Sequence, residues 1–112
     1  GPLTGKGKVF SVSLTFEPKA PKVSQLFSVR TVVTKLDGSK VTPTLVDVDA
    51  TMPSHGHGMM TKPQHKALAD GAWRSEGMKL HMHGAWLFEV KVQAGGQSES
   101  IKMPFDQPPE AR

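Results

Sequence analysis

The chain contains no cysteine and no tyrosine, and these absences limit what it can do. Without cysteine there is no thiolate nucleophile, no disulfide scaffold, no cysteine zinc site and no blue-copper centre. The sequence also lacks a Gly-x-Ser-x-Gly nucleophile motif, a phosphate loop and a dinucleotide-binding fingerprint. Because no catalytic machinery is visible, we expect a protein that is not an enzyme.

Long hydrophobic runs are missing as well. No stretch approaches the roughly 20 apolar residues of a transmembrane helix, so no membrane span is expected within this sequence. Residues 1–10 also lack the apolar centre of a secretory signal peptide. This second absence leaves the compartment open, because a processed protein would look the same.

Positive charge is present but dispersed. The formal net charge is +4 and the sequence pI about 9.6, yet the lysines occur singly along the chain. The only aromatic residues are five phenylalanines and two tryptophans, most of them at strand positions that would bury them. A nucleic acid is therefore not expected as a partner, since a stacking platform is lacking.

The chain does have alternation of apolar and polar residues. KVFSVSLTF, residues 8–16, is apolar at every second position from Phe10 to Phe16, which is typical of a half-buried strand. AWLFEVKVQ, residues 85–93, repeats the pattern most clearly. Comparable segments are 25–36, 44–52, 72–77 and 98–105, with 78–84 as a further extended piece. About seven short strands without a helix predict an all-β sandwich.

The length of 112 residues predicts a single domain. We assign residues 8–105 to the sandwich, residues 1–7 to a disordered N-terminal segment or an expression scar, and residues 106–112 to a Pro-rich tail. Residues 53–66 are rich in glycine and proline and show no periodicity. They predict a loop.

Histidine and methionine are concentrated in two windows. Of the five histidines and six methionines, nine lie in residues 52–60 and 78–83. Each window has a His-x-His pair, whose side chains point to the same side of an extended segment roughly 6.6 Å apart. Two such imidazoles can bind one metal ion. The candidate ligands are His55, His57, His81, His83, Met59, Met60 and Met82.

The predicted metal is copper. Imidazole binds Cu(II), Zn(II) and Ni(II), whereas the soft thioether sulfur of methionine selects Cu(I), so the mixed set favours copper in either oxidation state. Zinc is a weaker candidate because its structural sites usually include cysteine. Calcium and magnesium need oxygen ligands, which neither window supplies.

The same residues also have a purely structural interpretation. Met52, Met78 and Met82 occupy positions where a strand would bury a methionine. In this interpretation the loop glycines have no role beyond allowing the chain to turn. In residues 78–83 the alternation puts the methionines on one face and the histidines on the other, without showing which face is inside.

Three further polar residues have open roles. His65 stands apart from both windows and is a weaker candidate ligand. Asp47 and Asp49 share one face of a predicted strand. They form either a solvated outer face or hydrogen-bond partners for a histidine.

The two windows resemble a known family. MPSHGHGM (52–59) and GMKLHMHGAWLFEVKV (77–92) resemble the YtkA-like group of small bacterial extracytoplasmic domains, which is related in pattern to FixH proteins. The resemblance covers roughly residues 45–93. His83 departs from the pattern, which has proline there, so it is either an extra ligand or a neutral surface change. Gly84 and Trp86 match the pattern and are expected to form a tight turn and a core contact.

The resemblance implies an immunoglobulin-like β-sandwich outside the cytoplasm, linked in several cases to copper handling or respiratory oxidase assembly. The leading hypothesis is therefore a periplasmic or otherwise extracytoplasmic copper carrier, buffer or assembly factor, free or membrane-anchored. The alternative is a non-metal interaction module that offers a loop or edge strand to a membrane-complex protein.

Overall fold

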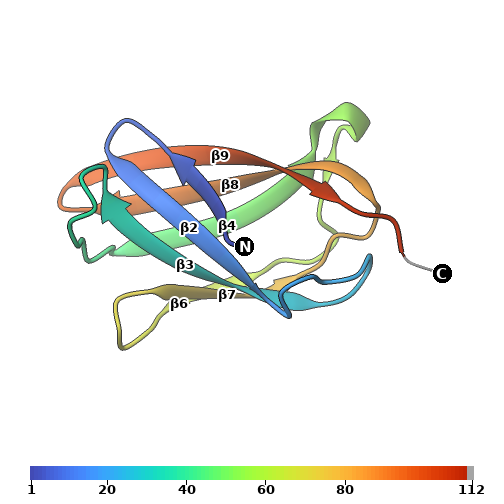
Figure 1. The fold of residues 1–112 in the computed structure, drawn as a ribbon, viewed down its shortest axis with the longest axis horizontal. Coiled ribbons are helices and arrows are strands. Elements are labelled where there is room, and N and C mark those ends of the chain that lie inside the picture. Colours follow the sequence, from blue (N-terminus) through green and yellow to red (C-terminus); the bar gives the residue numbers. More distant parts are fainter. Residues whose placement is uncertain (111–112) are drawn as a thin grey trace.

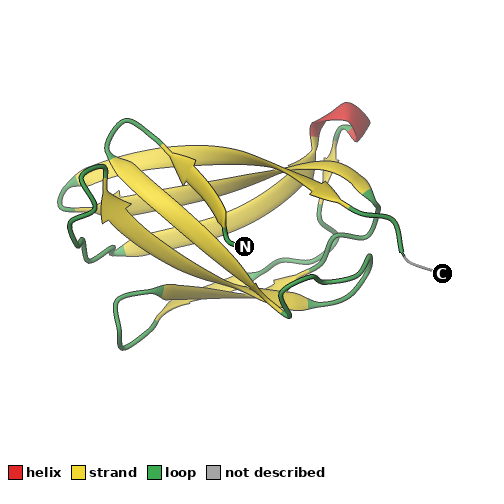
Figure 2. Cartoon of the chain, viewed as in Figure 1, coloured by secondary structure: helices red, strands yellow, loops and turns green. Residues whose placement is uncertain are grey.

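The computed structural model describes residues 1–110 as two antiparallel sheets packed face to face (Figure 1, Figure 2). One sheet has the strand order β1-β2-β3-β7-β6 and the other β5-β4-β8-β9. The strands are β1 (Leu3–Lys6), β2 (Phe10–Glu17), β3 (Phe27–Lys35), β4 (Leu45–Met52), β5 (His57–Gly58), β6 (Gln64–Ala67), β7 (Trp73–Met78), β8 (Gly84–Ala94) and β9 (Gln97–Gln107), with one 3-10 turn, η1 (Pro53–His55). The predicted all-β, immunoglobulin-like sandwich is confirmed. Within residues 1–110, no helix is long and apolar enough to cross a membrane.

The core lies between the sheets and follows the alternation seen in the sequence. In β8, Trp86, Phe88 and Val90 point inward and are buried, while the residues between them face outward. Phe16 from the opposite sheet stacks on Phe88 with ring centroids 5.3 Å apart. Burial of these large apolar side chains supplies most of the stability of such a sandwich.

The N-terminal residues are not disordered, contrary to the prediction. Leu3–Lys6 forms β1, which pairs with β2 in a register that sets Leu3 opposite Leu14. Gly5 also packs on β9, where an added Cβ would lie 2.6 Å from the Cγ of Met103. Four residues with little apolar alternation do not reveal a strand, because its stability comes from pairing with β2 and from packing on β9.

The C-terminal tail, predicted to begin at residue 106, begins later in the structure. β9 continues through Gln107, the last residue of its pairing with β8. The buried side-chain amide of Gln107 donates a hydrogen bond to the carbonyl of Pro21, at 3.0 Å. This contact fastens the end of β9 to the loop between β2 and β3.

The segment predicted as a loop contains regular structure, and the predicted extended piece does not. Residues 53–66 include η1, β5 and the start of β6, and β6 pairs with β7 so that Ala67 lies opposite Trp73. β6 was missed because only His65 among its residues turns toward the core side, which hides the alternation. Residues 79–83, in contrast, form no strand.

Candidate metal centre

The sheet register brings the two histidine windows to one end of the sandwich. β4 and β8 are antiparallel neighbours with Thr51 opposite Leu87, so β4 ends beside the start of β8. The first window follows β4 and the second precedes β8, and both lie at the end of the sandwich that carries η1 (Figure 1). Gly84 opens β8 with φ +121°, and a Cβ there would lie 3.2 Å from the Cε of Met52. This position therefore favours glycine, and the chain bends just before it, at residues 82–83.

Three imidazoles form a row at this end. His57 lies in the middle, with its ring centroid 5.7 Å from that of His55 and 5.1 Å from that of His81. His55 ends η1 and His57 opens β5, with Gly56 between them at φ +67°. The rings of His55 and His57 are thus adjacent because of a left-handed turn, and not because of the extended spacing that the sequence suggested.

Trp86 closes the inner side of the row. Its indole is 2% exposed and packs edge-on against His81 and His57, at centroid distances of 5.6 and 6.2 Å. Its Nε1–H donates a 2.9 Å hydrogen bond to the carbonyl of Met82, which fixes the ring. The predicted role of Trp86 as a core contact is confirmed by its burial. Its contact with both imidazoles was not predicted.

The ring nitrogens show which lone pairs are free. Nδ1 of His57 lies 3.1 Å from the carbonyl oxygen of Gly58, which can only accept, so Nδ1 carries the proton and Nε2 has the lone pair. Nδ1 of His81 is buried and has no hydrogen-bond partner among residues 1–110. A buried polar atom without a partner is unfavourable by about 1 to 3 kcal/mol. Metal coordination would satisfy it.

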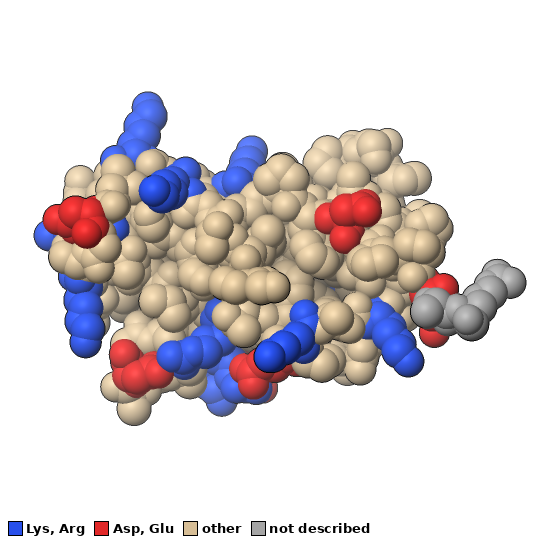
Figure 3. All heavy atoms as spheres, in the orientation of Figure 1, with Lys and Arg blue, Asp and Glu red and all other residues tan. Residues whose placement is uncertain are grey.

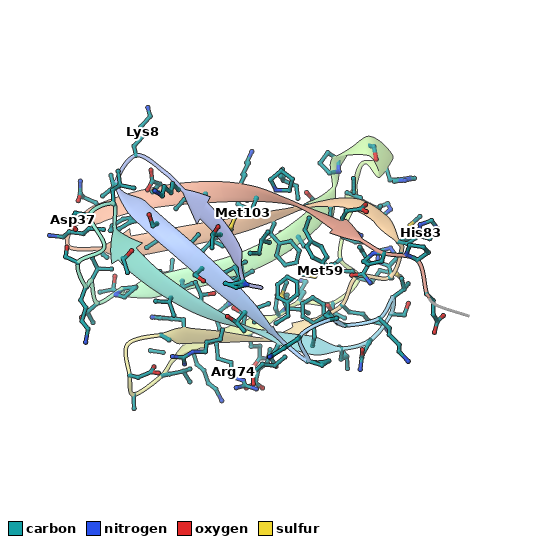
Figure 4. The ribbon with its side chains drawn as sticks, in the orientation of Figure 1. Lys8, Asp37, Met59, Arg74, His83 and Met103 are labelled. Atoms are coloured by element: carbon teal, nitrogen blue, oxygen red, sulfur yellow. The ribbon has the colours of Figure 1, made fainter. Side chains whose placement is uncertain are left out.

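The other predicted ligands differ in how far their side chains are buried. Met59 and Met82 are half-buried and pack against the core, whereas Met60 is 82% exposed. His83 is exposed and lies at the outer end of the sandwich, with Met59 further in (Figure 4). Met52 and Met78, whose strand positions predicted burial in the core, are fully buried.

The predicted face alternation in residues 78–83 holds for Met78 and Leu80, which are buried, and for Met82, which packs against the core. The two histidines, however, do not share one environment. Because residues 79–83 leave the sheet, His81 turns toward His57 while His83 faces solvent. The turn is held from the β2–β3 loop, where the N–H of Ser24 donates a 2.8 Å hydrogen bond to the carbonyl of Leu80. This hydrogen bond from Ser24, a non-glycine residue at φ +64°, could not be predicted from the sequence.

The row is not a closed cluster of ligands. Within residues 1–110, no three His, Asp or Glu side chains are grouped closely enough to hold a metal ion by themselves. Two imidazoles that bind one ion through nitrogens about 2.0 Å away have ring centroids roughly 5 to 6 Å apart. Both adjacent pairs in the row meet this spacing, so copper binding stays a prediction that the geometry accommodates.

His65 lies away from the row and connects the two sheets. Its Nδ1 lies 2.6 Å from the hydroxyl oxygen of Ser75, and its Nε2 lies 3.4 Å from Oδ1 of Asp47. Since a carboxylate can only accept, a proton on Nε2 faces Asp47 and leaves Nδ1 to accept from the Ser75 hydroxyl. Asp47 is therefore a partner for a histidine, one of the two roles left open above. The hydroxyl of Ser75 has no exposed surface and cannot reach a substrate, so the role of these contacts is structural. We call Ser75, His65 and Asp47 the clasp.

Replacing His65 with alanine is expected to lower the free energy of unfolding by about 1 kcal/mol, because the buried hydroxyl of Ser75 loses its partner. Urea unfolding measures the change. Lys66→Ala is the matched control on the exposed face of β6 and should change stability by less than about 0.5 kcal/mol. Equal effects of the two substitutions would show that the clasp contributes nothing.

Charged side chains are not concentrated at the end of the sandwich that carries the histidine row. On the face shown in Figure 3 the basic residues are scattered and do not gather in one patch. The ion pairs of lysine and arginine lie on the outer face of the other sheet, for example Arg30 with Asp70 at 2.6 Å and Arg74 with Glu17 at 3.3 Å.

Comparison with known proteins gives the family and the fold. A family model described as YtkA-like matches residues 4–91, most of the chain, which confirms the resemblance drawn from the two windows. Among solved structures, a DUF4426 family protein from Pseudomonas aeruginosa is similar with a TM-score of 0.65 and 11% identity, over 96% of this chain and 98% of that chain. At such low identity the likeness concerns the fold alone. No curated protein matches the chain.

Proposed function

The chain belongs to the YtkA-like family, and from that premise we propose that its histidine-bearing end binds a single copper ion, with His57 and His81 as the main ligands. One observation carries the proposal. His57 and His81 are 24 positions apart in the sequence, yet their ring centroids lie 5.1 Å apart, and His81 has a buried ring nitrogen with no hydrogen-bond partner among residues 1–110. The fold thus brings two nitrogen donors together beside Trp86.

The chemistry of the surroundings favours copper over zinc. His57 and His81 are neutral nitrogen donors, Met59 and Met82 bring thioethers close to the same end of the core, and Trp86 excludes water on one side. Soft sulfur and imidazole suit Cu(I), and Cu(II) can use the same nitrogens. Zinc would find two nitrogens but lacks the thiolates or carboxylates that usually complete its tetrahedral site.

The proposal includes a binding role and no catalytic step. It describes a carrier, buffer or assembly factor outside the cytoplasm, which exchanges copper with a protein partner such as a component of a membrane complex. An open-ended row of ligands at the tip of a rigid sandwich suits loading and release, because function is often placed on loops held by a stable scaffold.

Titration of the metal-free protein tests the proposal. Cu(I) is added without oxygen in competition with a chromogenic Cu(I) chelator, and Cu(II) and Zn(II) are added separately. We expect about one equivalent of Cu(I) to bind, and His57→Ala or His81→Ala to weaken it by roughly 30-fold, which corresponds to about 2 kcal/mol.

His83→Ala is the matched control, because His83 is exposed at the same end but stands outside the row. It should leave the affinity for Cu(I) within about threefold of the wild type. Weak and equal binding of all three ions would overturn the proposal. Complete absence of binding would also overturn it and would favour the interaction module.

A further inference from the structure

The three imidazoles form a row, and a row differs from a tripod in what it can do. A tripod holds an ion at one point, whereas His57 here is the common member of two separate pairs. Both pairs have the ring spacing that fits one shared ion, roughly 5 to 6 Å between centroids. The geometry therefore offers an outer position between His55 and His57 and an inner position between His57 and His81.

The two positions differ in exposure. His55 is exposed on η1, His57 is half-buried, and His81 has a buried nitrogen beside the indole of Trp86. The inner position is walled by Trp86, while the outer one faces solvent. Because His55 is exposed, an approaching partner reaches a metal ion more easily at the outer position.

We propose that His55 is the exchange ligand of the site, through which copper passes between the inner position and a partner protein. This inference rests on the proposed function. Its partner is a protein that offers imidazole or thioether donors, since such donors can replace His55 on Cu(I). His57 and His81 hold the resident ion, and His55 contributes little to the affinity.

The transfer is a ligand substitution with a balanced outcome. The bond from copper to His81 breaks as the bond to His55 forms, His57 stays bound throughout, and copper remains Cu(I). A donor of the partner then replaces His55 and afterwards His57. No proton or electron moves, because all the ligands are neutral, and one protein bond persists until the partner has bound.

The backbone around His55 leaves room for this movement. Gly56 has φ +67°, a conformation that other residues rarely adopt, and no atom lies within 4 Å of the place where its Cβ would be. The η1 turn also buries none of its residues. His55 can therefore change its position without disturbing the core.

Separate measurements of affinity and transfer rate test the inference. The Cu(I)-loaded protein is mixed with an excess of a chromogenic Cu(I) chelator, and the rate of copper transfer is followed at several chelator concentrations. We expect His55→Ala to slow the transfer by roughly tenfold while the Cu(I) affinity stays within about threefold of the wild type. His57→Ala should lose affinity instead.

His83→Ala is again the control and should change neither quantity. Loss of affinity in His55→Ala as large as in His57→Ala would overturn the inference, because His55 would then be a resident ligand. An unchanged or faster transfer rate would overturn it too. These results differ from failure of the proposed function, in which the wild-type protein itself does not bind Cu(I).

Discussion

Trp86→Ala is expected to lower the free energy of unfolding by about 3 to 5 kcal/mol, which is a large share of the stability of a domain of this size. The indole is 2% exposed and packs in the core where β8 begins. Its removal leaves a cavity that the two sheets cannot fill, because their strands fix the distance between them. The carbonyl of Met82 also loses its donor. Urea unfolding followed by circular dichroism measures the loss.

Trp86→Phe separates the ring from its N–H group. This substitution keeps an aromatic side chain in the core and removes the hydrogen bond to Met82, so we expect a loss of about 1 to 2 kcal/mol. Its fold should remain intact enough for a copper titration. If Trp86→Ala lowers stability by less than about 1 kcal/mol, the indole is not the packing centre that its burial indicates.

Much of this fold can be read from the sequence because it depends on local alternation. Phe10 to Phe16 and Trp86 to Val92 alternate over enough residues to fix both the strand and its inner face, and the structure has β2 and β8 there. β1 and β6 have four residues each and were not predicted. Such short edge strands are stable through pairing with the neighbouring strands β2 and β7, which their own periodicity does not encode.

The sequence predicted which segments form the candidate site, but it did not predict how their side chains are arranged. The bias toward histidine and methionine correctly singled out two windows that meet. Which histidines face each other depends on the register of β4 against β8, on the left-handed turn at Gly56 and on the departure of residues 79–83 from the sheet. His83 illustrates the limit, since it is two positions from His81 in the sequence but points to solvent.

At the opposite end of the sandwich, Glu99 holds the turn between β1 and β2. Its carboxylate accepts hydrogen bonds from the backbone N–H groups of Lys8, Val9 and Phe10. Partial burial acts to raise the pKa of Glu99, but the three N–H donors together hold it below the ordinary value of 4.5. The ionised carboxylate thus joins β9 to the chain that leads from β1 to β2.

The sign of the pH dependence follows from the lowered pKa. A carboxyl group that loses its proton more easily in the folded state adds stability above its unfolded pKa, and this stability is lost as the pH falls through the folded pKa. Glu99→Gln is therefore expected to lower the free energy of unfolding by about 2 kcal/mol near neutral pH, after allowance for solvent screening. The difference from wild type should shrink steadily below about pH 4.5, because protonated Glu99 and glutamine are then alike.

Urea unfolding of both proteins from neutral pH to about pH 3 measures this difference, and two variants show whether the carboxylate itself is responsible. Glu89→Gln removes the same charge from the outward face of β8 and should give a nearly constant, small difference. Gly7→Ala leaves Glu99 in place but puts a Cβ 2.2 Å from its carboxylate atoms, so the carboxylate must move and its hydrogen bonds to the backbone break. It should therefore flatten the pH dependence as Glu99→Gln does. A wild-type pH dependence in Gly7→Ala would mean that the three N–H donors do not lower the pKa of Glu99.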